Sequence, residues 1–546
     1  MSLFTRKDKS ANLLDNGIFD MRNTDFAGCA AMHKSGLCYV AQGYRHDADF
    51  LTQLKAHQDK GLLPSVTSYE TRSLEQVAEF YEGSSREAER AASDDSKTSG
   101  ERRLLRLITV AAAMKASDIR IIQHDTYTAL RIRVAGRELD YGHNWTPEEG
   151  DVAINAAFAM QDDGSANVTR QQGEFQSFSL SPKEKFPLPR GVAKLRVQMG
   201  FHESDTKLGS SLVARIFYND AKETGTLEDL GLDCEVLESL ARLRDNLKGC
   251  VIIGGETGDG KSTTLVRALE QAYDDHEGKI AIVTLEDPVE YRIRRVGVMQ
   301  IPLKSAGDDT SRTANYRKAL RNFVRINPDL GMIAELGDGV AAREALQFAS
   351  SGHGLYSTIH VDGANGILFR MAALGVPVEE LCQTGIIRLL LKQTLVRILC
   401  DDCKIPLTSV DLTSAQERKL VPLNGAHDGI YLCNTDGCQT CRGHFKSEEG
   451  SAAWAGTNRL LAVAEFIEPD DSYNAFVRNL DANGARNYWL KPESEGGMGG
   501  IELAQKTTEF VLQGRFDPFD CLLKKGDLTK QLNANQRADL GWKVTI

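Results

Sequence analysis

The sequence lacks an apolar run long enough to cross a membrane as a helix. Such a helix needs about 20 consecutive apolar residues. The longest candidate, from Gly385 to Leu399, is interrupted by charged or polar residues at Arg388, Lys392, Gln393 and Arg397. The first residues also lack the apolar stretch and the cleavage site of a secretory signal. We therefore predict a cytoplasmic protein whose contact with a membrane is peripheral.

The chain also lacks the positive charge that general nucleic-acid binding needs. Its formal net charge is −11, whereas a basic surface normally supplies the contacts to phosphates. Hydrophobic residues make up 41% and charged residues 26%, which is typical of a folded globular protein. We do not expect nucleic acid as a partner, although a local basic channel stays open as an alternative.

The 546 residues predict roughly three to five domains. Residues Gly83 to Arg103 contain almost no large apolar side chain, which predicts a linker after a first module whose clearest feature is an amphipathic stretch from Ala48 to His57. The predicted division is an N-terminal accessory or adaptor domain with its linker at 1–95, a small α/β domain at 100–222, a nucleotide-binding core at 223–399, a tetracysteine module at 400–445 and a helical C-terminal region at 446–546.

Short apolar runs alternate with helical segments through the predicted core. The runs are CVIIGG, IAIVTLED, LGMIAEL and GLYSTIH, between residues 250 and 360. Strands that alternate with helices predict an α/β fold with a mostly parallel sheet covered on both faces.

A glycine-rich loop follows the first of these runs and satisfies the pattern G-x-x-x-x-G-K-[ST]. Its backbone N–H groups would cradle phosphates at a helix N-terminus, the lysine would hold the β and γ phosphates, and the serine hydroxyl would bind Mg²⁺. The alternative is an ordinary glycine turn, which the strand and helix on either side disfavour. The predicted ATP-binding residues are Gly255, Glu256, Thr257, Gly258, Asp259, Gly260, Lys261, Ser262 and Thr263.

Carboxylates and histidines follow the later strands. Glu286, with Asp287 and Glu290 close behind it, ends one apolar run, and Glu335 ends another. Ligands bind at the carboxyl ends of strands in open α/β sheets, so these acids could converge on the glycine loop. The run SGHGLYSTIH adds His353 and His360, either of which could report the γ-phosphate by a hydrogen bond. Taken singly, such acids are as often helix caps or surface groups, and most lone histidines are structural.

Paired cysteines follow the core. Cys400 and Cys403 form one C-x-x-C pair, and Cys438 and Cys441 form another. Four thiolates in a tetrahedron suit Zn²⁺, and a site closed in this way is structural. A redox dithiol pair and unliganded buried cysteines are the alternatives, and Cys433 could compete as a ligand. The odd total of eleven cysteines does not suggest a disulfide framework.

Four motifs in order, GETGDGKST, TLEDPVEY, NPDLGMIAELGD and SGHGLYSTIHVDGA, resemble the phosphate loop, Asp box, Walker B segment and His box of the ATPases that power type II secretion and type IV pili. ASDIR, RIRVAGREL, KLRVQ and VARIFY resemble the family's second domain. The resemblance is good over about residues 104–445. It implies a RecA-like P-loop core preceded by a PAS-like domain, with a zinc-binding insertion.

The resemblance also implies roles for single residues. Glu335 would polarise the attacking water, Glu286 would assist at the magnesium ion and the water, and His360 would sense the γ-phosphate. Arg196 and Arg215 match arginines that reach the phosphates from the second domain. The alternative for these two residues is an ordinary arginine on a strand surface.

Three positions depart from the family pattern. Gly337 stands where an arginine is usual, so the function of that arginine is absent or supplied elsewhere, for example by Arg343. Asn327 and Arg120 replace an aspartate and a histidine. The chain therefore resembles a divergent member, closest in character to type IVb pilus assembly ATPases.

The expected function is that of an ATP-hydrolysing motor that powers assembly of a type IV pilus or a related secretion filament. The resemblance implies a homohexamer docked on a polytopic inner-membrane platform protein and acting indirectly on pilin. A retraction motor is one alternative, disfavoured by the tetracysteine module. A DNA-transfer translocase and a non-hydrolysing scaffold are the others. The sequence does not indicate which filament is served.

Overall fold

The computed structural model forms two compact units, one of residues 1–224 with 294–296 and one of residues 225–293 with 297–546. None of the helices in the described part of the chain has the length and apolar character that a membrane crossing requires. The structure describes residues 18–19, 21, 29–41, 44, 48–72, 77, 98–141, 145–162, 175–183, 186–204, 208–218, 226–287, 289–293, 295–303, 318–319, 322–323, 325–423, 428–443 and 454–525.

The described residues of the N-terminal part of the first unit include a three-stranded sheet and the helix α1. Its elements are β1 (Ala30–Met32), β2 (Leu37–Ala41), α1 (Ala48–Asp59) and β3 (Ser68–Arg72). β2 pairs antiparallel with β1 and parallel with β3, and α1 lies in the connection between the parallel strands. Phe50 and Leu54 of α1 are buried in this small core, so the predicted amphipathic helix is confirmed.

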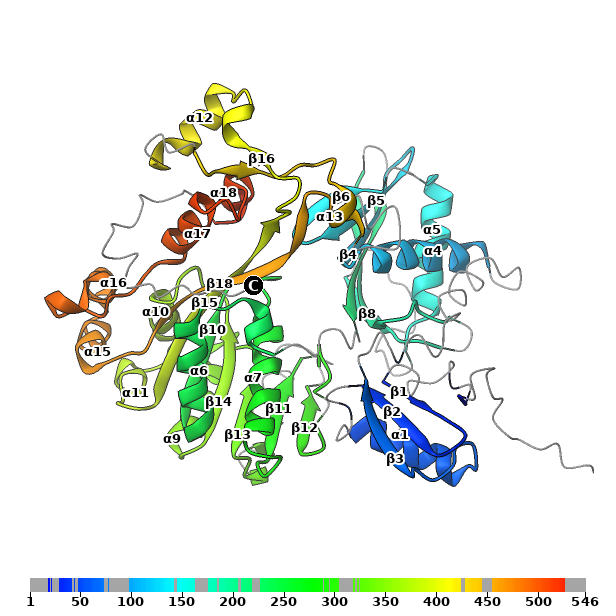
Figure 1. The fold of residues 1–546 in the computed structure, drawn as a ribbon, viewed down its shortest axis with the longest axis horizontal. Helices are drawn as coiled ribbons and strands as arrows, with labels where there is room; N and C mark the ends of the chain where they lie inside the picture. The colour runs from blue at the N-terminus through cyan, green and yellow to red at the C-terminus, as the bar shows by residue number, and fades with distance from the viewer. Residues whose placement is uncertain are drawn as a thin grey trace, which may run out of the picture. The chain divides into compact units, whose positions relative to one another are not determined.

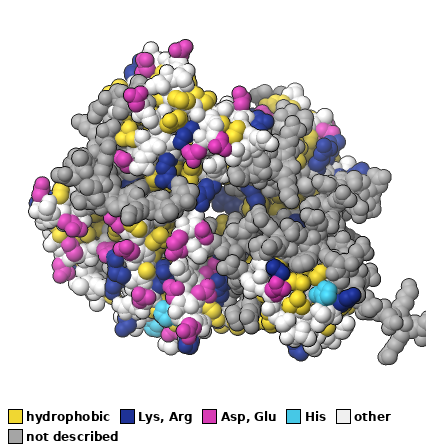
Figure 2. All heavy atoms as spheres, in the orientation of Figure 1, with side chains coloured by type: hydrophobic (Ala, Val, Ile, Leu, Met, Phe, Trp, Pro, Cys, Tyr) yellow, Lys and Arg dark blue, Asp and Glu magenta, His cyan; other side chains and the backbone are white. Residues whose placement is uncertain are grey.

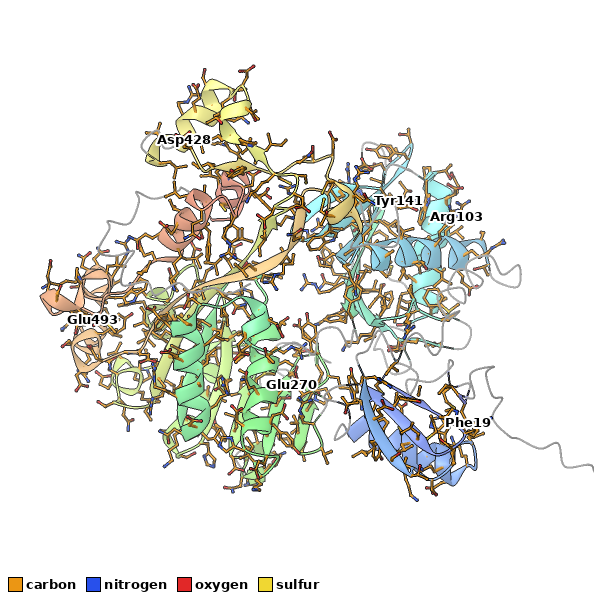
Figure 3. All side chains as sticks on the ribbon, viewed as in Figure 1. Phe19, Arg103, Tyr141, Glu270, Asp428 and Glu493 are labelled. Atoms are coloured by element: carbon orange, nitrogen blue, oxygen red, sulfur yellow. The ribbon has the colours of Figure 1, made fainter. Side chains whose placement is uncertain are left out.

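The rest of the first unit is a six-stranded antiparallel sheet in the order β6-β5-β4-β9-β8-β7. Two helices pack together and against β4 (Figure 1), and Arg103 of the first, labelled in Figure 3, forms an ion pair with Glu149 of the second. The elements are α4 (Ser99–Ala113), β4 (Ala116–Gln123), β5 (Thr128–Val134), β6 (Arg137–Asp140), α5 (Pro147–Ala159), β7 (Gln176–Leu180), β8 (Val192–Glu203) and β9 (Leu208–Tyr218).

The end of the predicted linker is wrong, because α4 begins at Ser99 rather than after Arg103. The Thr98 side chain accepts a hydrogen bond from the backbone N–H of Glu101, and the Glu101 carboxylate accepts one from the backbone N–H of Thr98. This reciprocal capping fixes the start of the helix. Most of the remaining predicted linker lies outside the described residues.

The second unit contains a seven-stranded sheet in the order β12-β11-β13-β14-β10-β15-β18, in which only β18 runs antiparallel to its neighbour. The predicted, mostly parallel sheet is thus confirmed. Its strands are β10 (Gly249–Gly254), β11 (Ile282–Glu286), β12 (Val298–Pro302), β13 (Leu330–Ile333), β14 (Gly354–Ile359), β15 (Ile387–Leu399) and β18 (Thr457–Ile467).

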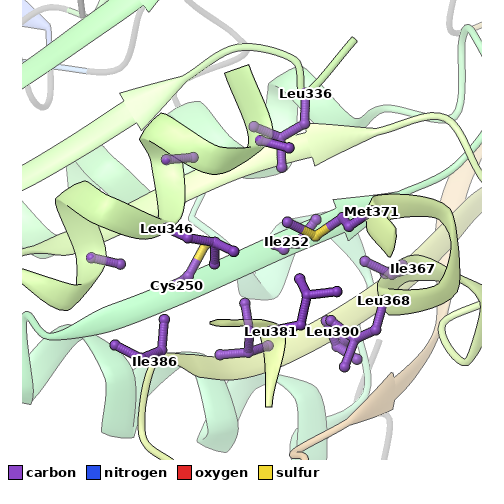
Figure 4. Close-up of a cluster of buried hydrophobic side chains, with 14 of the residues drawn as sticks. Cys250, Ile252, Leu336, Leu346, Ile367, Leu368, Met371, Leu381, Ile386 and Leu390 are labelled. Atoms are coloured by element: carbon purple, nitrogen blue, oxygen red, sulfur yellow. The ribbon is translucent and has the colours of Figure 1, made fainter. Parts of the chain in front are cut away.

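Helices cover both faces of this sheet. Successive side chains of a strand point to opposite faces, so Cys250 and Ile252 of β10 join one apolar cluster (Figure 4), while Val251 and Ile253 join another. The helices are α6 (Cys234–Asn246), α7 (Lys261–Asp275), α9 (Gly339–Ser350), α10 (Gly366–Ala373), α11 (Val378–Leu381), α15 (Asp471–Arg478) and α16 (Ala482–Leu490). α6 and α7 contribute to the second cluster, and α9, α10, α15 and α16 to the first.

The tetracysteine segment leaves the sheet after β15 and returns at β18, where Leu399 and Thr457 are register partners. The predicted helical region 446–546 therefore differs from the structure in one respect, because the apolar run from Leu460 to Ile467 forms a strand of the core sheet. The remaining strands and α-helices among the described residues are β16 (Ile405–Pro406), α12 (Ser414–Leu420), β17 (Tyr431–Leu432), α13 (Gln439–Gly443), α17 (Leu503–Leu512) and α18 (Pro518–Lys525).

Candidate functional site

The glycine-rich loop joins the carboxyl end of β10 to the first residue of α7, as predicted. Gly260 is the N-cap of α7 and has a φ of 78°, a left-handed conformation that favours glycine. A Cβ atom there would also lie 3.3 Å from Gln393 Nε2 and from both Leu395 methyl carbons. Backbone N–H groups at such a helix N-terminus form a ready site for anions, so the local geometry suits phosphate.

Lys261 lies folded into this loop. Its ammonium donates to the carbonyl oxygens of Gly255 at 2.7 Å and Glu256 at 2.9 Å. Burial lowers the pKa of Lys261, and the carboxylates of Asp259 and Glu335 oppose that shift. An anion that enters the loop would compete with the two carbonyls for the lysine.

Asp259 organises the loop from inside. One carboxylate oxygen accepts from the Glu256 backbone N–H at 2.8 Å, and the other accepts from the Thr394 hydroxyl at 2.9 Å. Gln393 adds a bond of 2.8 Å from its side-chain amide to the Asp259 carbonyl oxygen. Sequence reasoning missed Gln393 and Thr394. The sequence does carry a signal for them, because polar residues interrupt the apolar run that forms β15.

Glu335 and His360 come together at the carboxyl edge of the sheet. Each lies just beyond a strand, β13 and β14 respectively, and these strands are parallel neighbours. His360 Nε2 is 3.5 Å from Glu335 Oε1, and both side chains are about half exposed. β10 is the other neighbour of β14. Glu335 and His360 therefore lie at the carboxyl edge of the sheet, where β10 also leads into the glycine-rich loop.

Glu286 is the last residue of β11 and is almost fully buried. Its Oε1 atom accepts from the Thr284 hydroxyl at 2.6 Å and from the Gln300 side-chain amide at 2.9 Å. Burial raises the pKa of Glu286, and these two hydrogen bonds oppose that shift. Gln300, on β12, is a third residue that sequence reasoning missed.

The other candidate residues named from the sequence have different surroundings. Among the described residues, a Cβ atom at Gly337 would meet only Glu335 Oε1, at 3.9 Å. Arg343 Nε lies 3.7 Å from Glu380 Oε1 of α11. This ion pair is away from the glycine-rich loop. His353 precedes β14, at the opposite end from His360, where it contacts the Ser351 hydroxyl and stacks on a phenylalanine ring. Its environment is that of a structural histidine.

Arg196 and Arg215 belong to the first unit. They are register partners on β8 and β9, so their side chains leave the same face of the antiparallel sheet. Arg215 Nε donates to Asp118 Oδ1 on β4 at 3.0 Å. Asp118 therefore orients one of the two arginines, while their role at the phosphates stays a prediction.

The four paired cysteines form a compact cluster. Their sulfur atoms all lie within 4.8 Å of one another, and this is the one group of potential metal ligands among the described residues. Three sulfur–sulfur distances are 3.8–3.9 Å, far beyond a disulfide bond. Zn–S bonds of 2.3 Å in a tetrahedron would place sulfurs about 3.8 Å apart. The donor set and its spacing therefore fit Zn²⁺.

The surrounding backbone supports the cluster. The N–H groups of Cys438 and Gly456 donate to Cys441 Sγ at 3.1 and 3.3 Å. A hydrogen bond from the Cys441 backbone N–H is the main cause that lowers the pKa of Cys438 to about 7. Cys433 stays outside the cluster, with its sulfur 3.6 Å from the Ala455 carbonyl oxygen.

Known proteins resemble this chain over most of its length. Type II secretion system protein E of Pectobacterium carotovorum subsp. carotovorum is 26% identical over 399 residues, which are 69% of this chain and 66% of that protein. Type IV pilus assembly ATPase PilB of Myxococcus xanthus is 28% identical over 407 residues, which are 72% of this chain and 64% of that protein. The chain thus spans slightly less than two thirds of the length of these relatives.

A solved structure and a family model agree with these matches. The Legionella pneumophila ATPase DotB superposes with a TM-score of 0.52 at 19% identity, over 77% of this chain and 94% of that one, which shows a shared fold. The model of the family described as "Type II/IV secretion system protein" matches residues 192–464, half of the chain. That range includes the glycine loop, Glu286, Glu335 and His360. The chain belongs to the type II/IV secretion system protein family.

Proposed function

We propose that the chain is a Mg²⁺-dependent ATP hydrolase with a RecA-like core. The observation that supports this proposal is the position of Glu335 and His360 at the carboxyl edge of the sheet, where the strand–loop–helix turn that carries Lys261 begins. Lys261 and the loop N–H groups would hold the triphosphate, and Ser262 would hold the Mg²⁺ ion, which neutralises phosphate charge. Glu335 would orient and polarise the attacking water, with the buried Glu286 assisting.

The proposed role is that of a motor that powers assembly of a type IV pilus or a related type II secretion filament. The names of the relatives support this role. By family resemblance the chain would work in the cytoplasm as a homohexamer, docked on a polytopic inner-membrane platform protein and acting indirectly on pilin. The six-stranded domain would serve as the PAS-like second domain, whose movement against the core is coupled to hydrolysis.

Extension is favoured over retraction by the cysteine cluster, since assembly and secretion members of the family typically carry such a module. A DNA-transfer translocase is the second candidate function. It is disfavoured by the net charge of −11 and by the interspersed acidic and basic side chains on the visible face of the core (Figure 2). A scaffold that does not hydrolyse ATP is disfavoured by the presence of both Lys261 and Glu335.

Purified full-length chain is expected to hydrolyse ATP only with Mg²⁺ and at a rate that double-stranded DNA does not change. Phosphate release measured with and without magnesium and DNA checks this. Lys261→Ala is the control for hydrolysis at the proposed loop, because it removes the ammonium that would meet the phosphates. Stimulation by DNA would favour the translocase, and activity unaffected by Lys261→Ala would place hydrolysis elsewhere.

Zinc is expected at about one ion per chain, held by the four clustered cysteines. Cys400→Ser should release the metal and lower the melting temperature, because structural zinc contributes directly to folding free energy. Elemental analysis and thermal unfolding check both effects. Cys433→Ser is a matched control, since this nearby cysteine lies outside the cluster and its substitution should keep the zinc. The zinc assignment would be contradicted if purified wild-type protein contained no zinc and a chelator did not change its melting temperature.

A further inference from the structure

The residues that follow His360 form a short segment, 361–365, which leads into α10. Val361 lies tight against the end of β10, since a Cβ atom at Gly254 would come within 2.6 Å of Val361 Cγ1, much closer than non-bonded carbon atoms pack. Gly254 is the last residue of β10 and directly precedes the glycine-rich loop. A shift of the 361–365 segment would therefore disturb both His360 and the start of the loop.

The buried carboxylate of Glu465 anchors this segment from β18. Its Oε1 atom accepts from the backbone N–H of Ala364 at 2.7 Å, and its Oε2 atom accepts from the backbone N–H of Leu503, the first residue of α17, at 2.6 Å. Glu465 and Ala364 are both buried, and a buried N–H group that loses its partner is costly. A single carboxylate thus joins the 361–365 segment to α17.

Lys392 holds the same segment from the neighbouring strand. It is the register partner of Glu465 on β15, so the two side chains leave the same face of the sheet. Lys392 Nζ lies 3.5 Å from the Val361 carbonyl oxygen and 3.8 Å from Asp259 Oδ2 of the glycine-rich loop. Burial raises the pKa of Glu465, and its two N–H bonds and the nearby Lys392 oppose that shift. Two charged side chains that are neighbours in the sheet therefore contact the segment.

A third contact reaches the end of the segment from α15. The Tyr473 hydroxyl donates to Asn365 Oδ1 at 2.9 Å, and Asn365 Nδ2 donates to the Ala482 carbonyl oxygen at 3.1 Å. Tyr473 is buried. Side chains of β15, β18 and α15 thus hold the 361–365 segment along its length.

We propose that Glu465 is a positioning residue: by fixing the 361–365 segment to the sheet and to α17, it holds His360 where it can meet the γ-phosphate of a bound nucleoside triphosphate. The inference rests on the proposed ATP site and adds to it a residue outside the four motifs. A γ-phosphate sensor distinguishes ATP from ADP, so the decisive readout is the ratio of the Kd for ADP to the Kd for ATP. A merely structural contact would change stability without changing this ratio.

Glu465→Gln tests the proposal, because glutamine keeps the shape of the side chain but offers an oxygen to only one of the two N–H groups. In the full-length chain it should lower the Kd ratio about tenfold, the scale of one hydrogen bond to a charged group, and should lower kcat as well. In a His360→Ala background the same substitution should change the ratio less than about twofold, because the sensor is already absent. Titrations with ADP and with a non-hydrolysable ATP analogue measure each Kd.

Lys506→Met is the matched control, because it breaks a different buried contact of α17. Lys506 Nζ donates to Asp233 Oδ2, at the start of α6, at 2.6 Å. α6 packs in the apolar cluster on the sheet face opposite to the cluster that contains Ala364. Lys506→Met should lower the melting temperature, since breaking a buried ion pair is strongly destabilising, but should leave the Kd ratio within about twofold of wild type. An equal fall of the ratio in Lys506→Met and Glu465→Gln would overturn the inference, because a loosened α17 would then explain both.

The other outcomes are equally decisive. A wild-type ratio in Glu465→Gln or in His360→Ala, or an equal fall with and without His360, would overturn the inference and leave ATP hydrolysis by the wild-type chain intact. If Glu465→Gln does not fold, Glu465→Asp takes its place, since it keeps the charge but is too short to reach both N–H groups, and its ratio should fall in the same way. If neither variant folds, Glu465 is required for the fold as a whole and the inference is overturned. Wild-type chain that binds no nucleotide would instead refute the proposed function, and this inference with it.

Discussion

Glu335→Gln is expected to lower ATP turnover by about 100-fold or more, the scale of losing a catalytic base, while the Kd for ATP changes little. Glutamine has nearly the same shape as glutamate but cannot accept a proton from water. The Glu335 side chain is half exposed and none of its described contacts holds the loop in shape, so binding should persist. Single-turnover hydrolysis and nucleotide titration separate the two effects.

Glu379→Gln provides the matched control for that experiment. Glu379 lies on the short helix α11, is exposed, and is not part of the proposed site. Its substitution should leave turnover within about twofold of wild type, since substitutions of exposed residues away from a functional site usually have small effects. If Glu335→Gln hydrolysed ATP as fast as this control, the role of base would pass to another carboxylate, with Glu286 as the first candidate.

Arg215→Ala is expected to lower turnover strongly, by as much as about 10³-fold. An arginine supplied from outside the phosphate loop contributes roughly 10³–10⁵ in rate in related phosphoryl-transfer systems. Nucleotide affinity should change far less, because the loop N–H groups, Lys261 and Ser262 all belong to the core. Steady-state hydrolysis measures the loss, and light scattering monitors whether the assembly state is kept.

Arg131→Ala controls for the loss of a surface arginine from the same sheet. Arg131 is exposed to a similar degree as Arg215, at 39% against 43%, and has its own partner in Asp140 at 2.9 Å. Asp118→Asn provides a second comparison, since it keeps the Arg215 charge but removes its ion pair, and a smaller loss is expected. Equal activity of Arg215→Ala and Arg131→Ala would mean that Arg215 is an ordinary strand-surface charge.

Much of the candidate site could be predicted because its determinants are local in sequence. The glycine pattern requires particular backbone angles at particular positions, as Gly260 illustrates. The placement of Glu335 and His360 at the same edge of the sheet followed from a general rule, that parallel strands end at one edge of a sheet. Neither prediction required knowledge of which strands are neighbours.

The parts that were missed depend on strand order. Gln393, Thr394 and Lys392 contact the loop only because β15 pairs with β10, and no local pattern reveals that pairing. Their polar side chains interrupt an apolar run, which sequence reasoning used only to exclude a membrane helix. The early start of α4 is different, since Thr98 and Glu101 form a capping box that can be recognised from spacing alone.

The register pairing of Leu399 with Thr457 has a consequence for how the chain tolerates variation in length. Residues 400–456 leave and re-enter the core at two adjacent backbone positions, so the entropy of closing this excursion depends only weakly on its length. Each doubling of a flexible loop costs about 0.6 kcal/mol. Insertions within the excursion that keep the four clustered cysteines and its buried residues would therefore leave the alignment of β15 and β18 unchanged, and the sheet that carries the glycine-rich loop would keep its geometry.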